Sequence, residues 1–418
     1  MALICGALSM AAPVILHAQD HGAHSDSSIS VMVGAHAIGM VTHQSPAVAG
    51  RSLTEGYLTQ PTLMFHAGGR NLPAIQLMLS LEGLTLERGE LNPGIVGEGY
   101  IDRRHPHTYL HELTATLERG SDRARASLTV GKGFAPFGTD DPMVRPFVKY
   151  PINHHLAQIL ERVVAVGALR VGPVGVEVGS FNGDEPETSG DAPNRSRLWD
   201  SWAVRTTVFP MDGAEIQASY ASVRSPEIAK GGGPDDRKWS VSGRLENLGR
   251  KQYALAEWAR STGYVGPDKT LDFNSFLIEG QTGAGPLLLA GRLEVTERAD
   301  EERLSDPFRT SAGGHDFSIL GRSRWTIGTL GVAFPITMRG GASLAPFVEV
   351  AQHGARETFR PSGFVPADFY GSDRILVLSA GLRIGIGAIH RRMGRYGAAI
   401  PRQPGTTPSQ TPSPQHAH

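Results

Sequence analysis

Apolar and polar side chains alternate at every second position through most of the chain from Ser30 to Gly394. In residues 238–247, Trp239, Val241 and Leu245 occupy one face, and charged side chains and serines occupy the other. A period of two is that of a β-strand with two different faces. The pattern predicts about sixteen strands, at 29–41, 54–66, 72–87, 107–119, 122–133, 158–171, 174–183, 197–210, 213–225, 236–248, 251–262, 270–282, 286–298, 316–333, 341–355 and 374–388.

The predicted connections alternate strictly between long and short. Long ones cover 42–53, 88–106, 134–157, 184–196, 299–315 and 356–373, and short ones include Gly120-Ser121 and Gly172-Pro173. A soluble secreted β-protein also has alternating strands, but it has no reason to sort its connections by length. A transmembrane barrel sorts them, because its two rims face different compartments. The prediction is therefore an all-β fold: a transmembrane antiparallel β-barrel in the cell outer membrane, in contact with lipid, with short periplasmic turns and long extracellular loops.

The two ends of the chain differ from its middle in composition. Residues 1–18 are apolar, too short to span a bilayer and end in Leu16-His17-Ala18, which predicts a cleaved signal peptide. Residues 19–28 predict a flexible histidine-rich leader, 29–396 the barrel, and 397–418, rich in proline and serine, a disordered tail. The only cysteine, Cys5, lies in the signal, so the mature chain forms no internal disulfide.

Composition and charge narrow the class of function. The 51 glycines and 28 prolines among 418 residues favour strands and turns over long helices. With 40 basic and 41 acidic side chains, the net charge of -1 argues against a nucleic-acid partner. We expect no cofactor.

A barrel of about sixteen strands is too wide for side chains alone to fill, so it normally encloses water. The predicted function is passive diffusion of small polar solutes, and a slight excess of inward cations favours anions weakly. The strand pattern turns these pore-lining candidates inward: Arg205, Arg244, Arg292, Glu294, Arg322, Arg324 and Arg383.

The connection after residue 131 is too apolar and too rich in proline for a free surface loop. Two placements are open: the segment folds into the lumen and narrows it, or it covers the outer mouth. Folded inward, it would present these candidates to a solute: Lys132, Asp140, Asp141, Arg145, Lys149, His154 and His155.

The run Val130-Gly131-Lys132-Gly133-Phe134-Ala135-Pro136-Phe137-Gly138 resembles a segment of bacterial outer-membrane porins of the general and phosphate-selective type. The resemblance implies selective passive diffusion by a homotrimer. Phosphate selectivity is not expected, because the chain has only six lysines and does not end on the aromatic residue that closes the last strand of such porins.

Histidines and a lipid-facing site supply two alternatives. Clustered histidines, with His21, His24, His105 and His107 as candidates, would link the barrel to metal-ion handling, although we predict no built metal site. A barrel-borne lipid hydrolase would use His111 on the lipid-facing wall, but no partner serine stands out. The sequence contains no nucleophile elbow, phosphate loop or paired carboxylates, so we expect no enzymatic activity.

Overall fold

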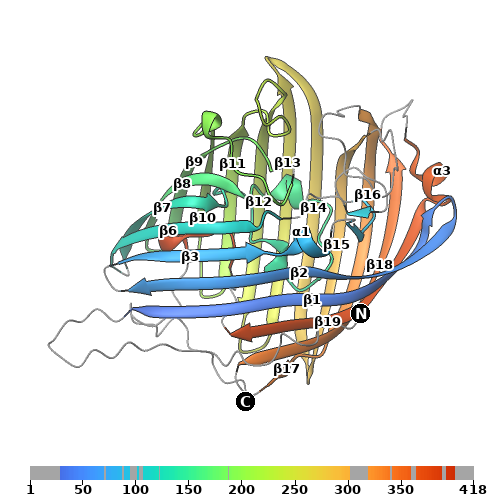
Figure 1. Cartoon of the computed structure of the whole chain (residues 1–418), viewed down its shortest axis with the longest axis horizontal. Helices are drawn as coiled ribbons and strands as arrows, with labels where there is room; N and C mark the ends of the chain where they lie inside the picture. The colour runs from blue at the N-terminus through green and yellow to red at the C-terminus, as the bar shows by residue number, and fades with distance from the viewer. Residues whose placement is uncertain are drawn as a thin grey trace.

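The computed structural model describes residues 29–69, 72–86, 89–94, 101–102, 107–121, 123–186, 188–301, 319–338, 341–358, 364–387 and 392–400. Within these ranges, sixteen long antiparallel strands form one continuous wall (Figure 1). They are β1 (Ser30–Val48), β2 (Arg51–Gly69), β3 (Leu72–Ser80), β6 (Leu110–Gly120), β7 (Ala124–Gly133), β8 (Arg162–Val171), β9 (Val174–Phe181), β10 (Ser201–Val208), β11 (Ala214–Val223), β12 (Asp235–Asn247), β13 (Gln252–Val265), β14 (Asp268–Ala284), β15 (Leu287–Glu301), β16 (Ile319–Ala333), β18 (Ala342–Glu357) and β19 (Arg374–Gly387). The predicted signal, the leader and residues 401–418 lie outside these ranges.

The wall closes on itself between the first and last strands. β1 pairs with β2 on one side and with β19 on the other, from Gly34 opposite Gly387 to Ser45 opposite Leu376. The remaining wall strands each pair with their neighbours along the chain, and the short β17 (Ile336–Thr337) adds to β18. A closed ring leaves no strand edge unpaired, as a bilayer requires. The predicted sixteen-strand barrel is therefore confirmed.

Connection lengths sort between the two ends of the barrel, with two exceptions. The end where β1 begins and β19 ends, here called the turn rim, carries only short connections, and the opposite end, the loop rim, carries all the long ones. The exceptions are at the loop rim, where two-residue turns join β1 to β2 and β13 to β14. Gly50 and Gly266 stand in these turns with φ of 76° and 58°, a conformation that glycine adopts without strain. The prediction of a long connection at 42–53 is therefore wrong, because both strands continue through it.

Short elements occupy the connections and the interior. They are α1 (Glu82–Thr85), β4 (Glu90–Leu91), β5 (Ile101–Asp102), the 3₁₀ turn Pro142–Val144, α2 (His154–Ala157), the 3₁₀ turn Arg195–Arg197, α3 (Pro366–Tyr370) and the 3₁₀ turn Gly397–Ala399. The strand predicted at 72–87 ends at Ser80, where the chain turns into α1.

The outer surface of the barrel is apolar and the inner surface is polar. On β15 and β16, Leu293 and Leu330 expose 64% and 70% of their surface, while the alternate residue Glu294 exposes 2%. The same alternation runs along the other wall strands. Apolar residues outside a closed ring are the arrangement that contacts lipid. The chain is an outer-membrane β-barrel.

Candidate functional site

Residues 134–161, which join β7 to β8, fold into the barrel from the loop rim and are called here the inner loop. Phe134, Phe137, Phe147 and Tyr150 expose no more than 3% of their surface, which is incompatible with a free loop or a cover over the mouth. Of the two placements that the sequence left open, the inward one is correct. The predicted strand at 158–171 begins only at Arg162, because residues before it belong to this loop.

Four glutamates, on β13, β14, β15 and β18, anchor the inner loop to one side of the barrel, called here the acidic wall. Glu349 accepts hydrogen bonds from the backbone N–H groups of Val148 (2.7 Å) and Lys149 (3.3 Å). Glu294 accepts one from the backbone of Ile152 (2.9 Å). The other two are Glu257 on β13, which accepts from Thr139 (2.6 Å) and Asn153 (2.7 Å), and Glu279 on β14. The carboxylates of Glu349 and Glu294 satisfy backbone donors that would otherwise be buried without partners.

Two cations of the inner loop pair with carboxylates, Arg145 with the acidic wall and Lys149 with Glu90 of β4. Arg145 lies 3.7 Å from Glu257 and 3.8 Å from Glu279. Lys149 donates to the Glu90 carboxylate at 2.7 Å and to the Tyr57 hydroxyl at 2.6 Å. Burial alone would lower the pKa of Lys149, but the charge of Glu90 outweighs it and holds the pKa above its usual value. Both cations therefore stay charged inside the barrel.

Cations of the wall also bind the inner loop, mostly through its carbonyl oxygens. Arg292 donates to the carbonyl of Lys149 (3.0 Å), and Arg383 donates to that of Pro146 (2.5 Å). Arg205 pairs with Glu177 and also donates to the carbonyl of Gly138 (3.1 Å). Arg244 forms an ion pair with Asp140 at 2.7 Å. The loop is thus held from β10, β12, β15 and β19 as well as by the glutamates.

A second segment, residues 392–400, also lies inside the barrel and is called here the C-terminal segment. Met393, Arg395 and Tyr396 expose no more than 4% of their surface. The Tyr396 hydroxyl accepts a hydrogen bond from the backbone N–H of Phe134 at 2.9 Å, so the two inserted segments meet. Residues 397–400 were predicted to belong to a disordered tail, and in the structure they pack against the wall instead.

The structure brings most of the candidate pore residues together but turns three of them away. Ser323, Trp325 and Ile327 of β16 face inward, so Arg322 and Arg324 project from the outer face. Arg324 pairs there with Glu297. Lys132 of β7 lies opposite the exposed Leu113 and alternates with Gly133, which faces Tyr396 in the lumen, so it also belongs to the outer face. The remaining candidates lie inside, on the wall or in the inner loop: Asp140, Asp141, Arg145, Lys149, His154, His155, Arg205, Arg244, Arg292, Glu294 and Arg383.

The residues that sequence reasoning missed include Glu257, Arg392 and Arg395. Glu257 alternates with outward Ala256 and Trp258 and could have been found by the period of two. Arg392 and Arg395 follow the last strand, where the period stops, and no local pattern indicates that they return to the lumen.

The hydrolase alternative requires His111 to face lipid, and in the structure it does not. A shift in register between β3 and β6 turns it inward, where it is fully buried and its Nδ1 lies 2.8 Å from Glu161. Its neighbour His107 lies 2.8 Å from Glu82. Among the described residues, no group of three or more histidine, cysteine, aspartate or glutamate side chains is arranged to hold a metal ion. His21, His24 and His105 lie outside the described residues.

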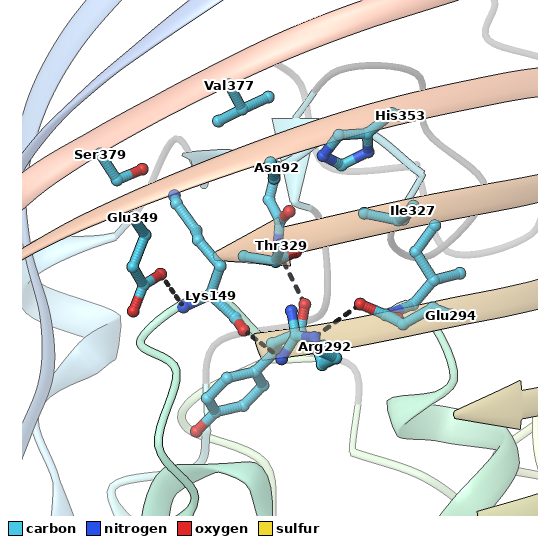
Figure 2. Close-up of a pocket in the computed structure, with 13 residues that line it drawn as sticks. Asn92, Lys149, Arg292, Glu294, Ile327, Thr329, Glu349, His353, Val377 and Ser379 are labelled. Atoms are coloured by element: carbon cyan, nitrogen blue, oxygen red, sulfur yellow. Dashed lines mark hydrogen bonds and ion pairs between the residues drawn. The ribbon is translucent and has the colours of Figure 1, made fainter. Parts of the chain in front are cut away.

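One small cavity lies between the inner loop and the acidic wall (Figure 2). Its volume is about 10 Å³, room for about one water molecule. Lys149, Arg292, Glu294 and Glu349 line it, and Figure 2 shows their contacts with one another and with the loop backbone. Thr329 Oγ1 and His353 Nδ1, which belong to two other lining residues, are buried and have no hydrogen-bond partner among the described residues. A water molecule here would satisfy both.

No helix among the described residues is long and apolar enough to cross a membrane.

No protein-family model and no curated protein matches the chain. Solved structures similar to it include an anion-selective porin from Comamonas acidovorans, with 10% identity, a TM-score of 0.49 and coverage of 86% of this chain and 100% of that one. OmpT, an outer membrane protein of Vibrio cholerae, has 9% identity and a TM-score of 0.48, with coverage of 87% of this chain and 98% of that one. The outer membrane channel DcaP of Acinetobacter baumannii has 9% identity and a TM-score of 0.47, with coverage of 88% of this chain and 99% of that one. At these levels the likeness adds nothing to the strand pairing, which by itself establishes the closed sixteen-strand barrel.

Proposed function

We propose that this barrel is a passive outer-membrane channel for small polar solutes, with a pathway narrowed by the inner loop and the C-terminal segment. The observation that carries the proposal is the polar, charged interior of a closed sixteen-strand ring whose outer surface is apolar. A protein that only needed a stable wall would gain nothing from placing so many charges inside, because each must be paired to offset its loss of hydration.

The packing of the interior supports a narrow pathway. Charged side chains on both inserted segments expose little surface; Arg145 and Lys149, for example, expose 4% and 5%. The cavity at the acidic wall holds about one water molecule. We therefore propose that only small solutes pass, and that passage depends on movement of an inserted segment.

A weak preference for anions is the finer part of the proposal. Most cations inside the barrel are paired with carboxylates, so the lumen has little net charge to select a passing ion. Arg383 is different, because its guanidinium bonds to the carbonyl oxygens of Arg145 (3.5 Å) and Pro146 (2.5 Å). Carbonyl partners do not neutralise its charge, and Glu349 acts on it only from beyond ion-pair distance, so it can attract an anion. We also propose a homotrimer, which the mass of the detergent-solubilised protein tests.

Single-channel recording of the full chain in planar bilayers tests the channel. We expect discrete conductance steps that become larger when the inner loop is displaced, for example by removing its anchors with Glu294→Ala and Glu349→Ala together. The matched control removes two exposed acids at the loop rim, with Asp268→Ala and Asp373→Ala. Inserted, folded protein that conducts in neither form would overturn the proposal.

The proposal also holds that the barrel is not an enzyme. Hydrolysis of phospholipid or ester by the purified barrel would contradict this part of the proposal.

A further inference from the structure

The C-terminal segment enters the barrel from the turn rim, the end opposite to the one that the inner loop enters. β19 ends at Gly387 on that rim, and residues 392–400 lie back inside the lumen against β6, β7, β8 and β9. Ala398 exposes none of its surface and Met393 exposes 1%. The two insertions therefore fill the lumen from opposite ends and meet at Phe134 and Tyr396.

Two arginines fix the beginning of the C-terminal segment. The Arg392 guanidinium makes two bonds to the Glu215 carboxylate, at 2.5 and 2.8 Å, and its Nε lies 2.6 Å from Asp140. Arg395 lies 3.4 Å from Asp140 and 3.3 Å from Glu215. Asp140 belongs to the inner loop and Glu215 to β11, so these ion pairs join the segment to both the loop and the wall.

Backbone contacts hold the rest of the segment. The carbonyl of Gly394 accepts a hydrogen bond from Arg205 at 2.7 Å, and the carbonyl of Ile400 accepts one from Arg125. The backbone N–H of Ala398 donates to the Ser127 hydroxyl at 2.9 Å. Because these contacts come from side chains of the wall, the segment makes no strand pairing that would have to break for it to leave.

The apolar part of this docking is limited to a few side chains. Apart from Met393 and Tyr396, the buried apolar side chains of the segment are alanines, which pack against Ala168. Buried ion pairs contribute little net stability compared with apolar packing, because both charges regain hydration when they separate. A segment held in this way can detach without unfolding the barrel.

We infer that residues 392–400 form a detachable plug that closes the lumen from the turn rim and is locked by Arg392 and Arg395 on Asp140 and Glu215. The inference rests on the proposed channel function. When the plug is docked, the space along β6 to β11 is filled. When it leaves, that side of the lumen opens while the inner loop keeps its anchors on the acidic wall.

The test combines thiol labelling with conductance, in the full chain with Cys5→Ser as background. Met393→Cys places a smaller side chain in the same buried position, and Asp212→Cys, in an exposed turn at the same rim, gives the rate of an open thiol. A membrane-impermeant maleimide is the probe. Each reporter is combined with Arg392→Ala and Arg395→Ala. The matched control is Arg123→Ala with Arg250→Ala, two exposed arginines in turn-rim connections.

We expect slow labelling of Met393→Cys, and labelling at least about tenfold faster in the Arg392→Ala, Arg395→Ala background, because Asp140 and Glu215 then lack these counter-ions while the segment is docked, which favours local opening. Conductance is expected to rise in the same background and to stay unchanged in the control. Unchanged labelling would overturn the plug. Faster labelling with unchanged conductance of a conducting protein would overturn its gating role. Faster labelling with no conductance in any variant would overturn the channel proposal while leaving a detachable segment.

Discussion

Arg205 shows how the lumen keeps a charged side chain buried. It lies directly across from Glu177 in the pairing of β10 with β9, with its Nε and Nη2 at 2.6 and 2.7 Å from the carboxylate oxygens. The two residues expose 1% and 2% of their surface. We expect Glu177→Ala to lower the free energy of unfolding by about 3–5 kcal/mol, because it leaves a buried charge without its counter-ion.

Urea unfolding of the barrel in lipid vesicles measures this effect. The control is Asp235→Ala, which removes the partner of the well-exposed Arg224. An exposed pair contributes about 0–1 kcal/mol, so the control is expected to change little. Equal effects of the two substitutions would show that the lumen is as hydrated as the surface, against the packed interior described here.

Ionisation of Asp140 should contribute to the pH dependence of the free energy of unfolding. Burial alone would raise the pKa of its carboxyl, but Arg392, Arg244 and Arg395 outweigh burial and hold the pKa well below the usual 3.8. The unfolded chain then takes up the proton first as pH falls, so the stability that Asp140 contributes is complete above about pH 4–5 and declines below it.

We therefore expect the difference in unfolding free energy between wild type and Asp140→Asn to be constant from pH 8 to about pH 5 and to shrink at lower pH. Asp212→Asn, at an exposed turn position, should stay within about 0.5 kcal/mol of wild type throughout. A difference that already shrinks between pH 7 and pH 5 would contradict the ion-pair cluster.

At the scale of elements, the inner loop depends on one close backbone contact. Gly138 has a φ of 67°, and a Cβ built on it would lie 1.6 Å from the carbonyl oxygen of Ala157. Gly266 has a φ of 58° with no atom within 4 Å of such a Cβ. Both alanine variants should lose about 1–2 kcal/mol through the left-handed backbone. Only Gly138→Ala should also displace the loop and enlarge the conductance steps, and equal conductance in both variants would exclude this contact as the anchor.

Strand positions could be predicted from the sequence, because a period of two is a property of each strand alone. The face that turns inward was harder to predict where partners come from distant segments. On β16, Trp325 points into the lumen and packs edge-on against His353 and Tyr370, at 6.2 and 5.9 Å between ring centres. An inward-facing Trp325 would be unfavourable in a purely aqueous lumen. Its inward position therefore depends on the side chains that pack inside the barrel. That is why Arg322 and Arg324 were assigned to the wrong face.

For the molecule as a whole, closure into a ring could be predicted and the filling of the ring could not. Closure follows from the number of strands and the sorting of their connections. Whether the lumen is filled depends on whether a connecting segment has binding partners inside the barrel. For Asp140 of the inner loop, one such partner is Arg392, which is distant in the chain. The apolar character of residues 134–155 indicated that they pack somewhere, but the return of residues 392–400 had no such indication in the sequence.

The outer surface of the whole barrel supplies a direct test of the membrane assignment. Leu293 lies in the apolar band, opposite Ile278 and Gly328 on the neighbouring strands. We expect Leu293→Arg to destabilise the barrel in lipid by about 2–4 kcal/mol, and Met211→Arg, at a turn beside the band, by about 0–1 kcal/mol. Unfolding in vesicles measures both, and equal small effects would mean that no lipid contacts Leu293.

The balance of charge over the whole lumen predicts its selectivity. Because inner carboxylates and cations are paired with one another, the reversal potential in a potassium chloride gradient should be small, with the sign of a weak anion preference. We propose Arg383 as the source of that preference, since carbonyl oxygens and not a carboxylate receive its bonds. We expect Arg383→Gln to move the reversal potential towards cations, and Arg374→Gln, exposed at the loop rim, to leave it unchanged. A strong preference that survives Arg383→Gln would place the selective charge elsewhere in the barrel.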